Sequence, residues 1–89
     1  GINDGNFNHK YKTIVYPNPF KTETVYQFDN MHNATISIYN CFGVLVSQEN
    51  NVKGNCVKIS RGNLKSGIYF IKLIESNKVV AIDKLVIVD

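Results

Sequence analysis

From Thr13 onward, short apolar runs alternate with turn residues at intervals of roughly ten residues, a spacing typical of β-sandwiches and barrels. The runs are rich in β-branched and aromatic residues, and no stretch of the chain shows a sustained helical period. We therefore predict an all-β, largely antiparallel domain, an immunoglobulin-like β-sandwich of about seven strands. The expected strands are "KTIVY", "ETVYQF", "ATISIYN", "GVLVSQE", "NCVKIS", "GIYFIKLIE" and "KVVAIDKLVIV".

The first run ends at "YPNP", from Tyr16 to Pro19. Pro17 and Pro19 each fix their own φ, lack a backbone donor and hold the preceding residue in extended geometry. The Asn18 side chain can close a small ring with the nearby backbone. The segment therefore predicts a strand end and a corner with a fixed change of direction.

Turn residues also have specific roles between the later runs. Gly43 lies where a hairpin needs positive φ, and the Asn40 side chain can brace the same turn. The polar segment "NNVKG" is suited to a second hairpin, between "GVLVSQE" and "NCVKIS". Leu64 is alone among polar residues in "RGNLKSG", so we expect it to plug the open end of the core, and Gly67 to let the chain turn tightly into the next strand.

The last two runs depart from simple alternation. "GIYFIKLIE" is apolar on both faces, so one face is covered by the N-terminal arm or by neighbouring side chains, or else forms a docking patch for a partner. In the last run the apolar positions change parity, which predicts a bulge, a bend or a change of sheet around Asp83–Lys84. If this long strand lies at an edge, it is exposed for pairing.

Composition narrows the class of protein. The 89 residues are enough for one domain, and there is no apolar run long enough to span a membrane. The net charge of +3 comes from dispersed basic residues, which gives nucleic-acid binding little support. Residues 1–12 are rich in Gly and Asn and are interpreted as a linker or N-terminal arm, with residues 13–89 as the domain. We expect the chain to be a piece of a longer protein, which leaves room for a secretion signal upstream.

The sequence contains no recognisable catalytic or metal-binding motif. It lacks the GxSxG, HExxH, P-loop and dinucleotide-binding patterns, so we expect no catalytic residues, no cofactor and no small-molecule substrate. Cys41 and Cys56 form no CxxC, and His9 and His32 are isolated. In a simple meander the two cysteines are farther apart than the roughly 7 Å that a disulfide allows between Cα atoms, which predicts two free thiols.

Four motifs in order resemble the C-terminal sorting domain, type A, of proteins secreted by the type IX (Por) system of Bacteroidetes. They are Y-P-N-P at Tyr16–Pro19, I-Y-N-x-x-G at Ile38–Gly43, L-x-x-G-x-Y at Leu64–Tyr69, and K-L at Lys84–Leu85. The resemblance covers about residues 13–89. It implies a non-catalytic β-sandwich that directs an attached upstream cargo across the outer membrane.

The resemblance also implies partners and a route. The domain is then read in the periplasm by the outer-membrane translocon and removed at the cell surface by a sortase-like peptidase, within or upstream of residues 1–12. By the same resemblance the residues recognised by the translocon are Gly67, Tyr69, Lys84 and Leu85. Many family members finish on a basic residue, whereas this sequence has Asp89.

A second interpretation is an immunoglobulin- or fibronectin-like accessory module of a surface enzyme, which binds polysaccharide or acts as a spacer. Polysaccharide binding needs an exposed aromatic platform, for which Tyr26, Tyr39 and Phe70 are the candidates. The position of the domain in its parent chain separates the two interpretations, because a sorting signal of this family lies at the C-terminus.

Overall fold

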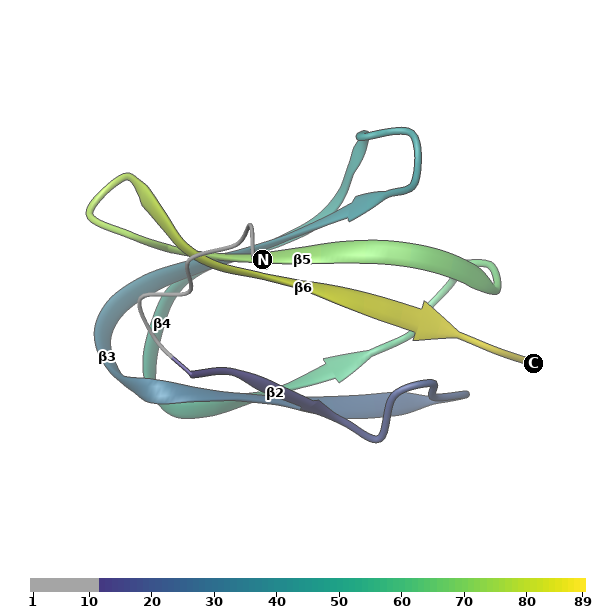
Figure 1. Cartoon of the computed structure of the whole chain (residues 1–89), viewed down its shortest axis with the longest axis horizontal. Coiled ribbons are helices and arrows are strands. Elements are labelled where there is room, and N and C mark those ends of the chain that lie inside the picture. The colour runs from purple at the N-terminus through teal and green to yellow at the C-terminus, as the bar shows by residue number, and fades with distance from the viewer. Residues whose placement is uncertain (1–11) are drawn as a thin grey trace, which may run out of the picture.

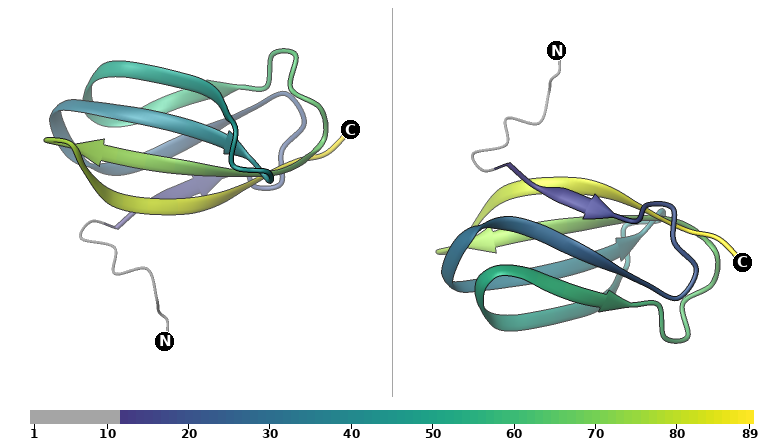
Figure 2. Two further views of the ribbon diagram at one scale, coloured as in Figure 1. Left: turned by 90° about the horizontal axis from the view of Figure 1, so that it is seen from above. Right: turned by 90° about the horizontal axis from the view of Figure 1, so that it is seen from below.

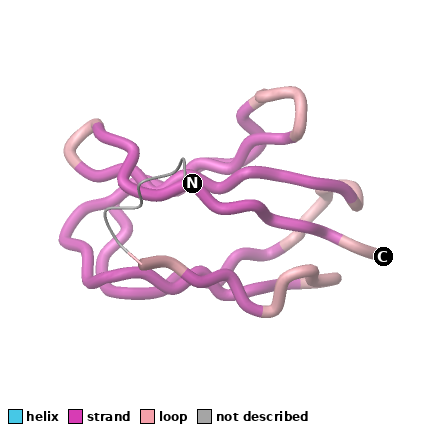
Figure 3. Tube along the Cα trace, viewed as in Figure 1, coloured by secondary structure: helices cyan, strands magenta, loops and turns pink. Residues whose placement is uncertain are grey.

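The computed structural model describes residues 12–89, all of them in strands, turns or extended segments (Figure 3). The strands are β2 (Ile14–Tyr16), β3 (Glu23–Asn40), β4 (Leu45–Ser60), β5 (Gly67–Glu75) and β6 (Lys78–Ile87). In this part of the chain there is no helix with the length and hydropathy needed to cross a membrane. The all-β prediction is confirmed. The expected linker, apart from residue 12, lies outside the described residues.

The five strands form one antiparallel sheet with the order β2-β3-β5-β6, and β4 pairs with the other side of β3. The first part of β3 pairs with β2 and its last part pairs with β5. Because β3 and β4 bend together between these parts, the sheet curls until its two halves face each other (Figure 1, Figure 2). Residues distant in sequence therefore enclose one core.

The bend explains why seven separate strands are not found. Two pairs of expected strands are continuous, within β3 and within β4, and the immunoglobulin-like sandwich of seven strands is not confirmed. The polar segment "NNVKG" lies inside β4, so the hairpin predicted there is wrong. The pairing of β3 with β4 continues through the bend with a shifted register. Met31, which lies opposite Gly54, is only 2% exposed although its neighbours in β3 are polar. Met31 of β3 and Val52 of β4, both buried, keep this stretch against the core.

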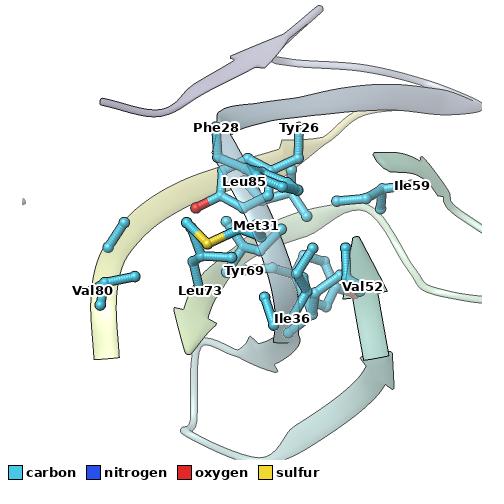
Figure 4. Close-up of a cluster of buried hydrophobic side chains, with 14 of the residues drawn as sticks. Tyr26, Phe28, Met31, Ile36, Val52, Ile59, Tyr69, Leu73, Val80 and Leu85 are labelled. Atoms are coloured by element: carbon cyan, nitrogen blue, oxygen red, sulfur yellow. The ribbon is translucent and has the colours of Figure 1, made fainter. Parts of the chain in front are cut away.

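The core lies between the two halves of the curled sheet (Figure 4). The Tyr26 and Phe28 rings meet edge to face, with their centroids 5.3 Å apart. Leu64 is half-buried and packs against the same cluster, and its expected role as a plug at the open end of the core stays a prediction. The fully or nearly fully buried apolar side chains include Phe20, Tyr26, Met31, Ile36, Ile71, Leu73, Ala81, Leu85 and Ile87.

The turn after β3 has the predicted chemistry. Gly43 has a φ of +83°, a region that favours glycine. The Asn40 side chain accepts hydrogen bonds from the backbone N–H groups of Phe42, at 2.9 Å, and Val44, at 3.0 Å. These two bonds brace the hairpin and confirm both predictions.

The register shift in β6 is real but is not at Asp83–Lys84, where we predicted it. Pairing between β5 and β6 is regular from Gly67–Ile87 to Leu73–Ala81, and the shift follows, at Val80. Val80 and Ala81 are consecutive buried residues, which requires the extra residue of a bulge. The bulge leaves Ala81, Asp83, Leu85 and Ile87 on the face that points to the core.

Candidate recognition site around the last strand

The YPNP corner is joined directly to the last strand. The Asn18 Nδ2 group donates to the carbonyl of Lys84, at 2.9 Å, and Asn18 Oδ1 accepts from the Val86 N–H, at 2.9 Å. The carboxamide thus bonds to the edge of β6 as the backbone of a neighbouring strand would. Asn18 was expected to close a local ring, and instead it bonds residues 66 and 68 positions away.

Phe20 extends this contact toward the end of β6. Its N–H donates to the Val86 carbonyl, at 3.0 Å, and its carbonyl accepts from the Val88 N–H, at 2.9 Å. The Phe20 side chain is 3% exposed and belongs to the core. Residues 18–20 therefore cover the edge of β6 from Lys84 onward and the Val88 that follows it (Figure 2). The expectation that this edge is exposed for pairing is wrong over that length.

Arg61 holds the segment that follows β6. Its guanidinium donates to three backbone carbonyls, those of Leu64 at 2.8 Å, Lys21 at 3.3 Å and Val88 at 3.2 Å. It also forms an ion pair with Asp89, with 2.6 Å between Nη2 and Oδ1. The hydrogen bond and the positive charge of Arg61 lower the pKa of Asp89. Sequence reasoning missed Arg61, the only arginine of the sequence, because most of its partners are far away along the chain, at Lys21, Val88 and Asp89.

The four residues expected to be recognised lie together, but they face different sides of the sheet. Tyr69 pairs with Leu85, Gly67 pairs with Ile87, and Lys84 pairs with Phe70. Tyr69 is 7% exposed and Leu85 is fully buried, whereas Gly67 and Lys84 are exposed. The Tyr69 hydroxyl donates to the Lys65 carbonyl, at 2.7 Å, which fixes the loop before β5. A partner of the folded domain can reach Gly67 and Lys84 without any rearrangement.

A polar contact crosses the core from β6 to the start of the domain. Asp83 Oδ2 accepts hydrogen bonds from the Tyr26 hydroxyl, at 3.0 Å, and from Thr13 Oγ1, at 2.6 Å. Burial raises the pKa of Tyr26, and the Asp83 carboxylate raises it further. The inward-facing carboxylate is thus satisfied by two hydroxyl donors, and it ties Thr13, β3 and β6 together.

The described residues offer little for other chemistry. No group of three or more His, Cys, Asp or Glu in residues 12–89 is arranged to hold a metal ion. Cys41, in the turn after β3, and Cys56, in β4 opposite Gln27, are exposed. Both thiols are free, as predicted.

Comparison with known proteins identifies the family. Residues 14–88 match the family model of the secretion system C-terminal sorting domain, which extends from the first residue of β2 past the end of β6. No curated protein matches the chain. Domains of this family are non-catalytic signals that send an attached protein to the cell surface or the extracellular space, so the match favours sorting over an accessory module. The chain therefore belongs to the family of C-terminal sorting domains and is a sorting signal for type IX secretion.

Proposed function

We propose that the translocon of the type IX system binds this folded domain in the periplasm and carries its cargo across the outer membrane. A sortase-like peptidase then removes the domain by cutting within or upstream of residues 1–12. The observation that carries the proposal is the pair of hydrogen bonds between Asn18 and the edge of β6, one donated and one accepted by the side chain. Those bonds make the first and last family motifs parts of one surface.

Within this surface, we propose that Gly67 and Lys84 contact the translocon directly. Both are exposed and lie on adjacent strands at the same end of the sheet. Tyr69 and Leu85 are buried, and their role is to hold the two strands from the core side. The four residues then act as one recognition element with two surface positions and two supporting positions.

We also propose that residues 13–89 are the folding unit. The hydrogen bond from Thr13 to Asp83 and the covering of β6 by residues 18–20 support a domain that starts at Thr13. The two facing halves of the curled sheet then act as the layers of an immunoglobulin-like sandwich, with bends in β3 and β4 replacing two of the expected connections.

The test is a fusion of residues 13–89 to the C-terminus of a periplasmic reporter, expressed in hosts with and without the type IX translocon. We expect display or release of the reporter only in the host that has the translocon. Surface fractionation and protease shaving of intact cells measure the outcome. Equal display in both hosts would refute sorting by this domain.

A further inference from the structure

The half of the sheet that contains β5 and β6 has a second apolar side, opposite the core. Direct cross-strand partners point to the same side, and the buried Tyr69, Ile71 and Leu73 identify the core side. We call the other side the outer face. Its residues are Thr35, Ser37 and Tyr39 of β3, Ile68, Phe70, Lys72 and Ile74 of β5, and Val79, Ile82, Lys84 and Val86 of β6.

The outer face exposes more apolar surface than an ordinary solvent-facing strand does. Phe70 is 38% exposed, Ile68 is 46% exposed and Val79 is 50% exposed. Scattered apolar side chains are normal on protein surfaces, but contiguous ones on adjacent strands mark interaction sites. Phe70 lies between Tyr39 and Lys84 in the sheet, at the centre of this apolar side.

A pocket of about 300 Å³ opens on the outer face beside the turn after β3. Tyr39, Phe70 and Ile82 form much of its apolar lining, and Asn40, Cys41 and Gly43 form the wall at the turn. The turn rises beyond the layer that contains β5 and β6 (Figure 1), so the pocket has a raised side. This shape fits an inserted side chain better than a flat surface.

The charges of the outer face indicate which residues of a partner would lie beside the inserted side chain. The two charged residues of the outer face are Lys72 and Lys84, and the face has no carboxylate. The Lys72 Nζ lies 4.6 Å from the centroid of the Tyr39 ring, at the edge of the pocket. A second copy of this chain would bring ammonium groups against ammonium groups, which disfavours self-association through this face.

We propose that the outer face docks a protein segment that inserts an apolar side chain flanked by carboxylates. This inference rests on the proposed function and names the chemistry of the translocon segment that binds there. Phe70 and Tyr39 receive the apolar side chain, and Lys72 and Lys84 pair with the carboxylates. Because Lys84 is both a residue of the outer face and a proposed recognition residue, docking on this face also brings the partner to a residue already proposed for recognition.

Titration with defined peptides tests the chemistry directly. The probes are acetyl-Glu-Phe-Glu-amide and acetyl-Lys-Phe-Lys-amide, added at low salt to the ¹⁵N-labelled 89-residue chain. We expect shifted amide resonances at Tyr39, Phe70 and Lys72 with the acidic peptide alone. The double variant Lys72→Glu/Lys84→Glu should bind about tenfold more weakly, and Lys72→Arg/Lys84→Arg should bind as the wild type does. Equal shifts with both peptides, or none at these residues, would overturn the inference.

Secretion of the reporter fusion tests the role in the cell. Phe70→Glu should lower translocon-dependent secretion about tenfold, whereas Ile14→Glu, a matched change at an exposed residue of β2, should not. Circular dichroism of the purified variants verifies that both are folded, and Lys72→Glu provides a second variant of the same face. Normal secretion of Phe70→Glu and Lys72→Glu would overturn the docking inference alone, because the wild-type fusion would still depend on the translocon.

Binding assays on the purified chain test two other occupants of the outer face, a membrane and a second copy of the chain. Co-sedimentation with phosphatidylglycerol vesicles that Phe70→Glu abolishes would assign the face to a membrane and overturn the inference. A dimer in sedimentation velocity that the same change abolishes would assign it to a second copy, with the same consequence. Absence of both supports the peptide partner when the acidic peptide binds.

Discussion

Asn18 shows how one side chain can replace part of a strand. Its carboxamide offers a donor and an acceptor, as a peptide group does, and both are used by the edge of β6. Edge strands with free N–H and C=O groups invite unwanted pairing, and a proline-rich corner cannot itself add a regular strand. The asparagine between the prolines therefore protects an edge that its neighbours cannot pair.

Replacing Asn18 by Asp tests this role. The change puts a carboxylate oxygen where Nδ2 now faces the Lys84 carbonyl, so one hydrogen bond becomes a repulsion. We expect a loss of about 1–2 kcal/mol in the free energy of unfolding, measured in urea. Asn55→Asp, the same chemical change at an exposed position of β4, is the control. Equal stability of the two variants would show that the Asn18 contacts do not contribute.

The ion pair of Arg61 with Asp89 predicts a pH dependence. Arg61 lowers the pKa of Asp89 in the folded state. The stability that the ion pair adds to the fold is therefore fully present above the unfolded pKa of Asp89, near 3.8, and is lost as the pH falls through the lower folded value. Thermal melts from neutral pH to about pH 2 should show the wild type losing its advantage over Asp89→Asn only in the acidic range. A difference in melting temperature between the two proteins that stays constant across the pH range would show that the ion pair does not contribute to stability.

At the scale of elements, β6 combines two functions on its two sides. Leu85 is fully buried, whereas its neighbour Lys84 points to the outer face and is exposed. The bulge at Val80 is what places Leu85 and Ile87 toward the core after the consecutive buried pair Val80 and Ala81. A single strand thus carries part of the core and part of the proposed recognition surface.

Variants of Leu85 and Lys84 should have different effects, one on stability and the other on sorting. Leu85→Ala is expected to lower the free energy of unfolding by about 2–5 kcal/mol, because it leaves a cavity in the core. Lys84→Ala should change stability by less than about 0.5 kcal/mol while it lowers secretion of the reporter fusion. Chemical denaturation and secretion assays on the same two variants provide the measurement. Normal secretion of Lys84→Ala would remove Lys84 from the proposed recognition residues.

At the scale of the whole molecule, hydrogen bonds and core packing join the first segment of the domain to its last strand. Phe20 bonds β6 and fills the core, Thr13 bonds Asp83, and Arg61 joins the carbonyls of Lys21 and Val88. The fold is therefore complete only when its last strand is present.

Deletion of residues 84–89 should therefore unfold the domain as well as block secretion. It removes Leu85 and Ile87 from the core and the hydrogen-bond partners of Asn18 and Phe20. We expect the truncated fusion to accumulate in the periplasm with a protease-sensitive domain, measured by limited proteolysis. A truncated domain that stays protease-resistant would show that the closure between the two ends is dispensable.

Part of this organisation could be predicted because its causes are local. The period of apolar residues indicates strands, Asn40 and Gly43 predict a hairpin from the needs of one turn, and the order of four motifs identifies the sorting family. These signals act over a few residues, or depend only on order along the chain. Some expectations that needed more than local chemistry, such as separate strands at the polar bends, were wrong.

By itself, the sequence determined the all-β class, the hairpin after β3, the free thiols and membership of the sorting family. The tertiary structure alone decided the site of the bulge, the covering of β6 by Asn18 and Phe20, the contacts of Arg61, and which recognition residues are exposed. The physical reason is register: a shift of one residue exchanges core and surface, and register is set by partners that are distant in the sequence, such as Ser60 opposite Glu23 and Ile87 opposite Phe20.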